Sequence, residues 1–316
     1  MSAAGAGRGV SVTGFLFAVG SAASFALSGI FASALMVAGW SPGAAVTARV
    51  VLAALVLLPP TLIALRGSWG MVRRAWRSLL LFGVLGVAGC QLAFFLAVQF
   101  IPPSLALLIE FMGPVLLILW TWATTRVRPS GLVLLGALMA VAGLVAISGL
   151  AVGGSLHPLG ILFALMAAVG LAAFFVLGAN ADHGIPPIPF TGLGLGIAAV
   201  VLAAVSAVGV LPFSVSADPT TIAGVEVSPW VAVAGMVLIS TVFSYVLGVA
   251  ASRRLGATVA SFTGYSEPLF GIFWTIVLLA IMPTGTQWIG AALIVAGVIT
   301  VKVGELRAAR SSSRSR

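Results

Sequence analysis

Three charged side chains, Arg49, Glu110 and Glu267, lie inside long apolar runs of the sequence. A charge at the centre of a membrane-spanning helix costs about 2.5–3.5 kcal/mol on insertion scales, so such a residue usually marks a substrate or ion pathway. A carboxylate there can bind a cationic group or carry a proton, and a guanidinium can bind a carboxylate through two parallel hydrogen bonds. We therefore predict a substrate or proton site that contains these three residues.

The same residues leave other interpretations open. Either glutamate could be purely structural, accepting hydrogen bonds from backbone donors that a helix kink has freed. Arg49 lies near one end of its apolar run, where its head group could reach the membrane surface. It could also pair with one of the glutamates rather than with a substrate carboxylate.

Both glutamates belong to a stretch that occurs twice. Pro114 and Pro268 are 154 residues apart, and the surrounding residues align at the same offset. A proline inside a helix leaves the carbonyl four residues earlier without its partner, so we predict a kink at each proline. Broken helices at equivalent positions of two repeats point to a transporter's binding site. Each stretch holds one glutamate and one glycine in exchanged order: Glu110 with Gly113, and Gly264 with Glu267.

Small polar and aromatic residues extend the predicted site. Ser21, Ser24 and Ser28 follow the i, i+3, i+7 spacing of one helix face, which we expect to line the cavity. The alternative is that their hydroxyls bond back to their own helix. Phe94 and Tyr245 fall in the middle of apolar runs, and glycines let a ligand approach the backbone. The predicted cavity lining is therefore Ser24, Ser28, Phe94, Gly113, Tyr245 and Gly264.

The sequence contains no pattern for a cofactor, a metal or an enzymatic nucleophile. It has no GxxxxGK[ST] phosphate loop, no HExxH motif and no GxSxG elbow. Its single cysteine, Cys90, has no partner in the chain and is interpreted as a small buried residue. We therefore predict no cofactor, no metal site and no enzyme activity.

The composition is that of a polytopic membrane protein, with 61% hydrophobic and only 7% charged residues. A helix needs about 20 apolar residues to cross the hydrocarbon. Ten runs meet that length: 13–35, 43–65, 78–100, 103–125, 130–150, 158–180, 189–211, 230–251, 256–281 and 284–301. The net charge of +9 does not indicate nucleic-acid binding, because the basic residues occupy short breaks between these runs.

The basic residues also predict orientation. With the N-terminus inside, every Lys and Arg except Arg49 lies on the cytoplasmic side, which favours an N-in, C-in topology. Residues 1–150 and residues 151–316, the latter with a basic cytoplasmic tail, then form two repeats of five helices each. Because five is odd, the second repeat is inverted. An earlier echo aligns Gly14-Phe-Leu-Phe-Ala18 with Gly160-Ile-Leu-Phe-Ala164 at an offset of 146.

At this level the sequence resembles the EamA-type drug/metabolite transporter superfamily, and within it the threonine/homoserine exporter branch. The stretches that carry the resemblance are Thr47-Ala-Arg49, Ala106-Leu-Leu-Ile-Glu110-Phe-Met-Gly-Pro114, Ser240-Thr-Val-Phe-Ser-Tyr245 and Ser266-Glu267-Pro268. The chain departs from that branch at Gly248, where the branch tends to keep a glutamate. The resemblance implies export of small metabolites, amino acids among them, from the bacterial cytoplasm by alternating access.

We therefore predict a secondary-active exporter of amino acids or related small polar metabolites, coupled to protons, in the bacterial inner membrane. Its partners would be a small-molecule substrate, protons and the lipid bilayer, without nucleic acid, and a homodimer is left open. One alternative is an exporter of cationic drugs or quaternary ammonium compounds, which would not need Arg49. A non-transporting membrane scaffold is another, and it would tolerate Gln in place of both glutamates.

Overall fold

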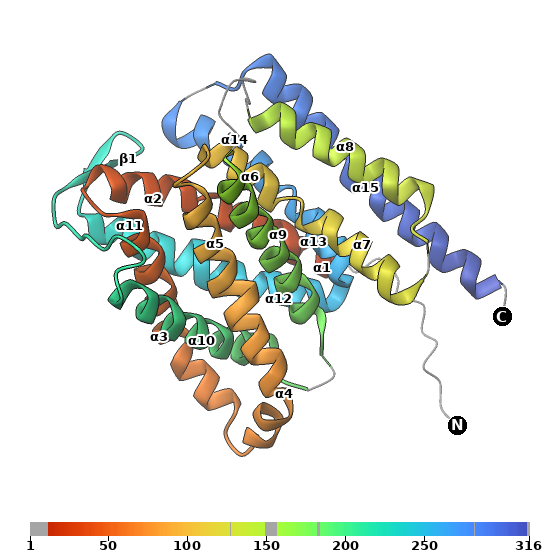
Figure 1. The fold of residues 1–316 in the computed structure, drawn as a ribbon, viewed down its shortest axis with the longest axis horizontal. Coiled ribbons are helices and arrows are strands. Elements are labelled where there is room, and N and C mark those ends of the chain that lie inside the picture. Colours follow the sequence, from red (N-terminus) through yellow and green to blue (C-terminus); the bar gives the residue numbers. More distant parts are fainter. Residues whose placement is uncertain (1–11, 127, 149–156, 182–183, 281, 315–316) are drawn as a thin grey trace.

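A computed structural model describes residues 12–126, 128–148, 157–181, 184–280 and 282–314, which are helical almost throughout (Figure 1). Helices dominate because a backbone inside a bilayer must satisfy its own N–H and C=O groups. The helices of the first half are α1 Val12–Ala26, α2 Ser28–Val37, α3 Pro42–Ala64, α4 Trp69–Leu81, the π-helical η1 Phe82–Gly89, α5 Cys90–Ala97, α6 Pro103–Glu110, α7 Gly113–Thr125 and α8 Gly131–Ser148.

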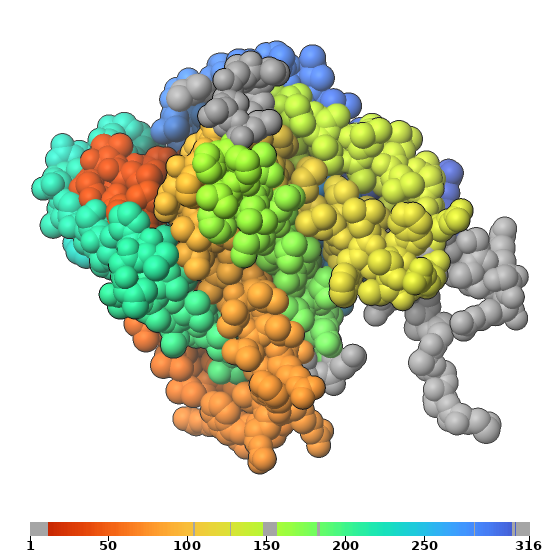
Figure 2. Space-filling view, in the orientation of Figure 1, coloured from red at the N-terminus to blue at the C-terminus, as the bar shows by residue number. Residues whose placement is uncertain are grey.

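The second half repeats this pattern and adds a small hairpin. Its elements are α9 Pro158–Ala179, α10 Pro187–Ala207, β1 Thr220–Ile222, β2 Val225–Val227, α11 Pro229–Val237, the π-helical η2 Leu238–Phe243, α12 Ser244–Leu255, α13 Ala257–Gly264, α14 Glu267–Leu279 and α15 Gly285–Arg314. In the view of Figure 2, α4, α9 and α10 cover much of one face of the molecule.

Nine helical segments of the described residues are long and apolar enough to cross a bilayer, so the chain is a multi-pass membrane protein. The run predicted at 130–150 corresponds to α8, whose apolar part, Gly131–Ile147, is shorter than the others. Residues 149–156 lie outside the described part of the chain. The count of ten spans, the inverted repeat and the orientation therefore stay predictions.

Each proline stretch contains a complete helix break. Helix α6 ends at Glu110 and α7 begins at Gly113, while α13 ends at Gly264 and α14 begins at Glu267. Pro114 and Pro268 lie in the first turn of the second helix of each pair, where a missing N–H costs no hydrogen bond. The bounds of both helices in one pair differ from those in the other by 154 residues.

Two π-helical segments, which the sequence analysis did not predict, occur at related places. Residues 238–243 of η2 correspond to residues 84–89 of η1 at the offset of 154. Such widened turns are rare and frequently occur at functional sites. Here each one leads directly into a helix, α5 or α12, that carries polar side chains toward the interior.

The loop after α10 forms the β1–β2 hairpin, a departure from the expected all-helical fold. The strands pair antiparallel with Thr220 opposite Val227. The Thr220 hydroxyl donates to the Ala34 carbonyl at 2.6 Å, and Trp40 Nε1 donates to the Ser216 carbonyl at 2.7 Å. These contacts fix the loop over the ends of α2 and α3.

Helices α8 and α15 pack side by side in one chain (Figure 1). A Cβ atom added to Gly136 would lie 2.6 Å from the Gly297 carbonyl oxygen, and one added to Gly143 would lie 2.6 Å from that of Gly290. The four glycines therefore let the two backbones approach each other closely, as small residues do in membrane helix pairs.

Candidate functional site: a charged cavity between the two halves

A cavity of about 530 Å³ lies among helices from both halves of the chain. Its size is within the range of about 300–1,000 Å³ typical of small-molecule sites. Arg49, Glu110 and Glu267 all line it, and they come from α3, α6 and α14. The fold thus brings together the three charged residues that the sequence analysis selected.

Arg49 is held deep in this site. Helix α3 begins with Pro42 in its first turn, and the Ser41 hydroxyl accepts a hydrogen bond from the Ala44 N–H, which caps the helix two turns before Arg49. The side chain of Arg49 is only 5% exposed. Its Nη1 donates to the Ser28 hydroxyl at 2.6 Å, and its guanidinium carbon lies 5.3 Å from the centre of the Phe25 ring.

Glu110 lies at the end of α6, where the helix breaks. Its Oε1 accepts a hydrogen bond from the Cys90 thiol at 3.2 Å, and the same thiol lies 3.4 Å from the Ala167 carbonyl oxygen. Cys90 is buried and also lines the cavity. The cysteine interpreted as a plain buried residue therefore contacts a candidate functional carboxylate.

Glu267 occupies the first turn of α14 and lines the cavity. A carboxylate at a helix N-terminus interacts favourably with the partial positive charge of the unpaired N–H groups there. Among the described residues no side chain donates a hydrogen bond to it. Its carboxylate is therefore the less constrained of the two.

Most of the other predicted lining residues reach the cavity, and two do not. Those that line it are Ser28, Phe94, Tyr245 and Gly264. The prediction for Ser24 is wrong. Ser24 does not line the cavity, and its hydroxyl donates to the Gly20 carbonyl at 2.7 Å within its own helix. The prediction for Gly113 is also wrong, because this residue does not line the cavity. A Cβ there would lie 2.9 Å from the Ala168 carbonyl oxygen, so this glycine serves close helix packing against α9.

Several cavity residues were missed by the sequence analysis. Gln91 Nε2 donates to the Tyr245 hydroxyl at 3.2 Å, and both residues line the cavity. They are 154 residues apart, so they occupy equivalent positions in the two copies. A mid-run glutamine in an otherwise apolar segment is a signal that could have identified this polar pair.

Two arginines of α12 contact residues of neighbouring helices at one end of that helix. Arg253 donates hydrogen bonds to the carbonyls of Ile185 and Gly178, and its guanidinium lies 5.1 Å from the Phe190 ring centre. Arg254 lies 4.6 Å from the ring centre of Phe17. These contacts join α12 to α1, α9 and α10 at that end.

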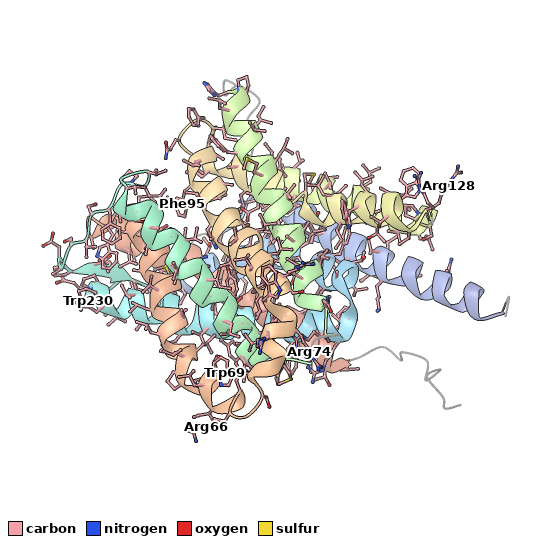
Figure 3. All side chains as sticks on the ribbon, turned by 60° about the horizontal axis from the view of Figure 1, so that its bottom comes forward. Arg66, Trp69, Arg74, Phe95, Arg128 and Trp230 are labelled. Carbon is pink, nitrogen blue, oxygen red and sulfur yellow. The ribbon has the colours of Figure 1, made fainter. Side chains whose placement is uncertain are left out.

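A second group of arginines lies in the turn between α3 and α4 and within α4. Arg66 and the exposed Arg73, Arg74 and Arg77 lie at and just after the turn between α3 and α4. Figure 3 shows Arg66 and Arg74 close to Trp69 at one end of the molecule, away from Phe95.

In the described residues no group of three His, Cys, Asp or Glu side chains could hold a metal ion.

Comparison with known proteins gives three findings. A sequence profile of the EamA-like transporter family matches residues 12–149 and again residues 158–303. A curated protein of Salmonella typhimurium, described as the uncharacterized inner membrane transporter YicL, is 27% identical over 240 residues, which are 74% of this chain and 76% of that protein. A crystal structure described only as that of a protein matches with a TM-score of 0.72 at 22% identity, covering 92% of this chain and 95% of the other.

Proposed function

The chain belongs to the EamA-like transporter family, and from that premise we propose that it exports amino acids or related small polar metabolites by proton-coupled alternating access. The observation that carries the proposal is the single cavity shared by Arg49, Glu110 and Glu267. Charges in a bilayer are costly unless they serve a ligand, an ion or each other. A cavity with one cation and two anions suits a substrate that carries both signs.

We further propose ten spans in two inverted repeats, residues 1–150 and 151–316, with both termini in the cytoplasm of a bacterial inner membrane. Contacts that recur after exchange of the halves support this arrangement. The Cys90 thiol lies 3.4 Å from the Ala167 carbonyl oxygen, and the Ser244 hydroxyl donates to the Ser21 carbonyl at 3.0 Å. Cys90 and Ser244 are related by the offset of 154, and Ser21 and Ala167 by that of 146.

The described conformation corresponds to an outward-facing state in this proposal. The cavity extends to Ser33, Met36 and Pro42, at the junction of α2 and α3 that the charge pattern assigns to the outside. At the opposite end, the Arg253 and Arg254 contacts hold α12 against its neighbours. Alternating access would break those contacts and close the outer end.

Proton coupling rests on the unequal surroundings of the two carboxylates. Glu110 accepts a hydrogen bond from Cys90, whereas Glu267 has no side-chain donor among the described residues. A carboxylate with few fixed partners can exchange its proton for a substrate cation as the cavity opens to either side. We assign both glutamates to the transport cycle.

The direct test is a metabolite profile of medium and cytoplasm in cells with and without overexpression. Export of amino acids predicts their accumulation in the medium, and cells expressing the Glu110→Gln, Glu267→Gln double variant should lose it. If overexpression instead lowers only the cellular content of quaternary ammonium compounds, the cationic drug exporter is correct. If neither changes, the scaffold alternative gains support.

A further inference from the structure

Arg49 has more hydrogen-bond donors than the described chain satisfies. A guanidinium presents five N–H donors in a planar fork and always carries its charge. Ser28 accepts from Nη1, while the buried Nε has no hydrogen-bond partner among the described residues. An unmet donor on a buried cation is costly, because neither water nor protein replaces its lost hydration. This geometry points to an anionic ligand.

The two nearest candidates for a counter-ion stay apart from the guanidinium. Glu110 accepts from Cys90, and the hydrogen bonds of Arg49 within the described residues do not include either glutamate. Yet all three groups line the same cavity. The site is therefore divided into a cationic part and an anionic part with space between them.

The surroundings of Arg49 also fix its orientation. Phe25 covers one face of the guanidinium at 5.3 Å, a favourable cation–π arrangement, and Ser28 holds Nη1 from the neighbouring helix. Both residues line the cavity. A guanidinium held on a face and at one nitrogen presents its remaining edge in a defined direction, as bidentate carboxylate binding requires.

Aromatic rings form much of the remaining wall. Phe174 lies 5.4 Å from Tyr245 and 5.2 Å from Phe175, and Phe25 lies 6.0 Å from Tyr245, measured between ring centres. All four rings line the cavity. Where a ligand side chain meets these rings, rather than the serines and Gln91 that also line the cavity, an apolar group is favoured, and a hydroxyl there would lose its hydrogen bonds to water.

We propose that Arg49, oriented by Ser28 and Phe25, is a carboxylate-binding subsite, and that the ligand is an α-amino acid with a bulky apolar side chain. The ammonium group lies toward Glu110 and Glu267, and the side chain packs against the aromatic wall. This inference rests on the proposed function for its site and deepens it, since it favours a leucine-like ligand over a threonine-like one. A dianion would meet the two carboxylates, and a ligand without a carboxylate would leave Arg49 without its anionic partner.

Binding to the purified full-length protein tests the inference without requiring transport. The probes are leucine, its decarboxylated analogue 3-methylbutylamine, its deaminated analogue 4-methylpentanoate, and threonine, each titrated by calorimetry. Leucine should bind at least about tenfold more tightly than each of the other three, because each analogue leaves a buried partner unpaired or buries a polar group.

The variants Arg49→Lys and Ser28→Ala separate the subsite from general damage. Arg49→Lys keeps the charge but loses the fork, so leucine affinity should fall about tenfold or more while 3-methylbutylamine affinity stays unchanged or rises. Ser28→Ala should give a smaller loss in the same direction. Arg77→Ala, at an exposed arginine on α4 beside Trp76, is the matched control and should bind leucine like the parent protein.

The outcomes distinguish the inference from the proposed function. Leucine binding that depends on Arg49, without any export, would leave the subsite standing and contradict the exporter. Amino-acid export with unchanged leucine binding in Arg49→Lys would leave the exporter standing and overturn the subsite. Equal binding of leucine and 3-methylbutylamine, tighter binding of threonine, or no leucine binding at all would also overturn it.

Discussion

The Tyr265 hydroxyl donates a hydrogen bond to the backbone carbonyl of Phe111 at 2.6 Å, and the two residues are 154 positions apart. Each is the first residue after a helix that breaks beside the cavity, α13 for Tyr265 and α6 for Phe111. Tyr265 is fully buried, and its ring contacts that of Phe111 with centres 6.0 Å apart. The two helix breaks are thus joined directly by this hydrogen bond.

Tyr265→Phe should lower stability because it leaves the buried Phe111 carbonyl without this donor. A lost hydrogen bond of this kind costs about 1 kcal/mol. We expect a lower midpoint of thermal unfolding for the variant in detergent, with ligand affinity retained. An unchanged midpoint would mean that the hydrogen bond between the breaks contributes nothing measurable to stability.

Replacing the two carboxylates singly should separate substrate binding from proton coupling. Glutamine keeps the shape of Glu110 or Glu267 but cannot carry a charge, so at least one variant should lose proton-driven net efflux while still exchanging labelled for unlabelled substrate. Proteoliposomes assayed with and without a pH gradient provide the measurement. Normal rates with normal pH dependence in both variants would make the glutamates purely structural.

The glycine contacts between α8 and α15 predict a position-specific effect of added volume. Gly143→Ala places a methyl group 2.6 Å from the Gly290 carbonyl oxygen, and such overpacking costs about 1–3 kcal/mol. Gly196→Ala in α10 meets nothing within 4 Å and should be neutral or stabilising, since alanine favours a helix more than glycine does. The midpoint of thermal unfolding should fall for Gly143→Ala and stay unchanged or rise for Gly196→Ala, and equal shifts would argue against the close approach.

Cysteine labelling tests the proposed orientation in a Cys90→Ser background. Ala217, in the loop after α10, and Gly70, at the start of α4, are both exposed. A membrane-impermeant maleimide should label Ala217→Cys in intact cells and Gly70→Cys only after permeabilisation. Ser252 is unsuitable as an internal reporter because it is fully buried and its hydroxyl donates to the Gly248 carbonyl. Labelling of Gly70→Cys in intact cells would contradict the N-in topology.

Much of this architecture follows from patterns within the sequence. The family resemblance is confirmed by the family match, which covers residues 12–149 and 158–303. The offset of 154 located both helix breaks, because proline determines local backbone geometry wherever it stands. The intramembrane charges likewise identified three cavity residues, since a charge has few tolerable positions in a bilayer.

The misses have a common physical origin in contacts between distant helices. Of the three serines expected on one face, Ser21 and Ser28 line the cavity, whereas Ser24 does not and its hydroxyl donates to the Gly20 carbonyl of its own helix. The thiol of Cys90 donates a hydrogen bond to Glu110, which lies on another helix. No local periodicity encodes such pairs, because they depend on how helices pack in three dimensions.

The most direct test of the central claim is efflux of labelled leucine from proteoliposomes when the external medium is acidified. The parent protein should release leucine faster than protein-free vesicles do, acidification should accelerate release, and Arg49→Ala should reduce the rate to near the protein-free level. A quaternary ammonium compound loaded into the same vesicles should not be released faster by the parent protein. Leucine release by Arg49→Ala at the parent rate, or no protein-dependent release at all, would contradict the account.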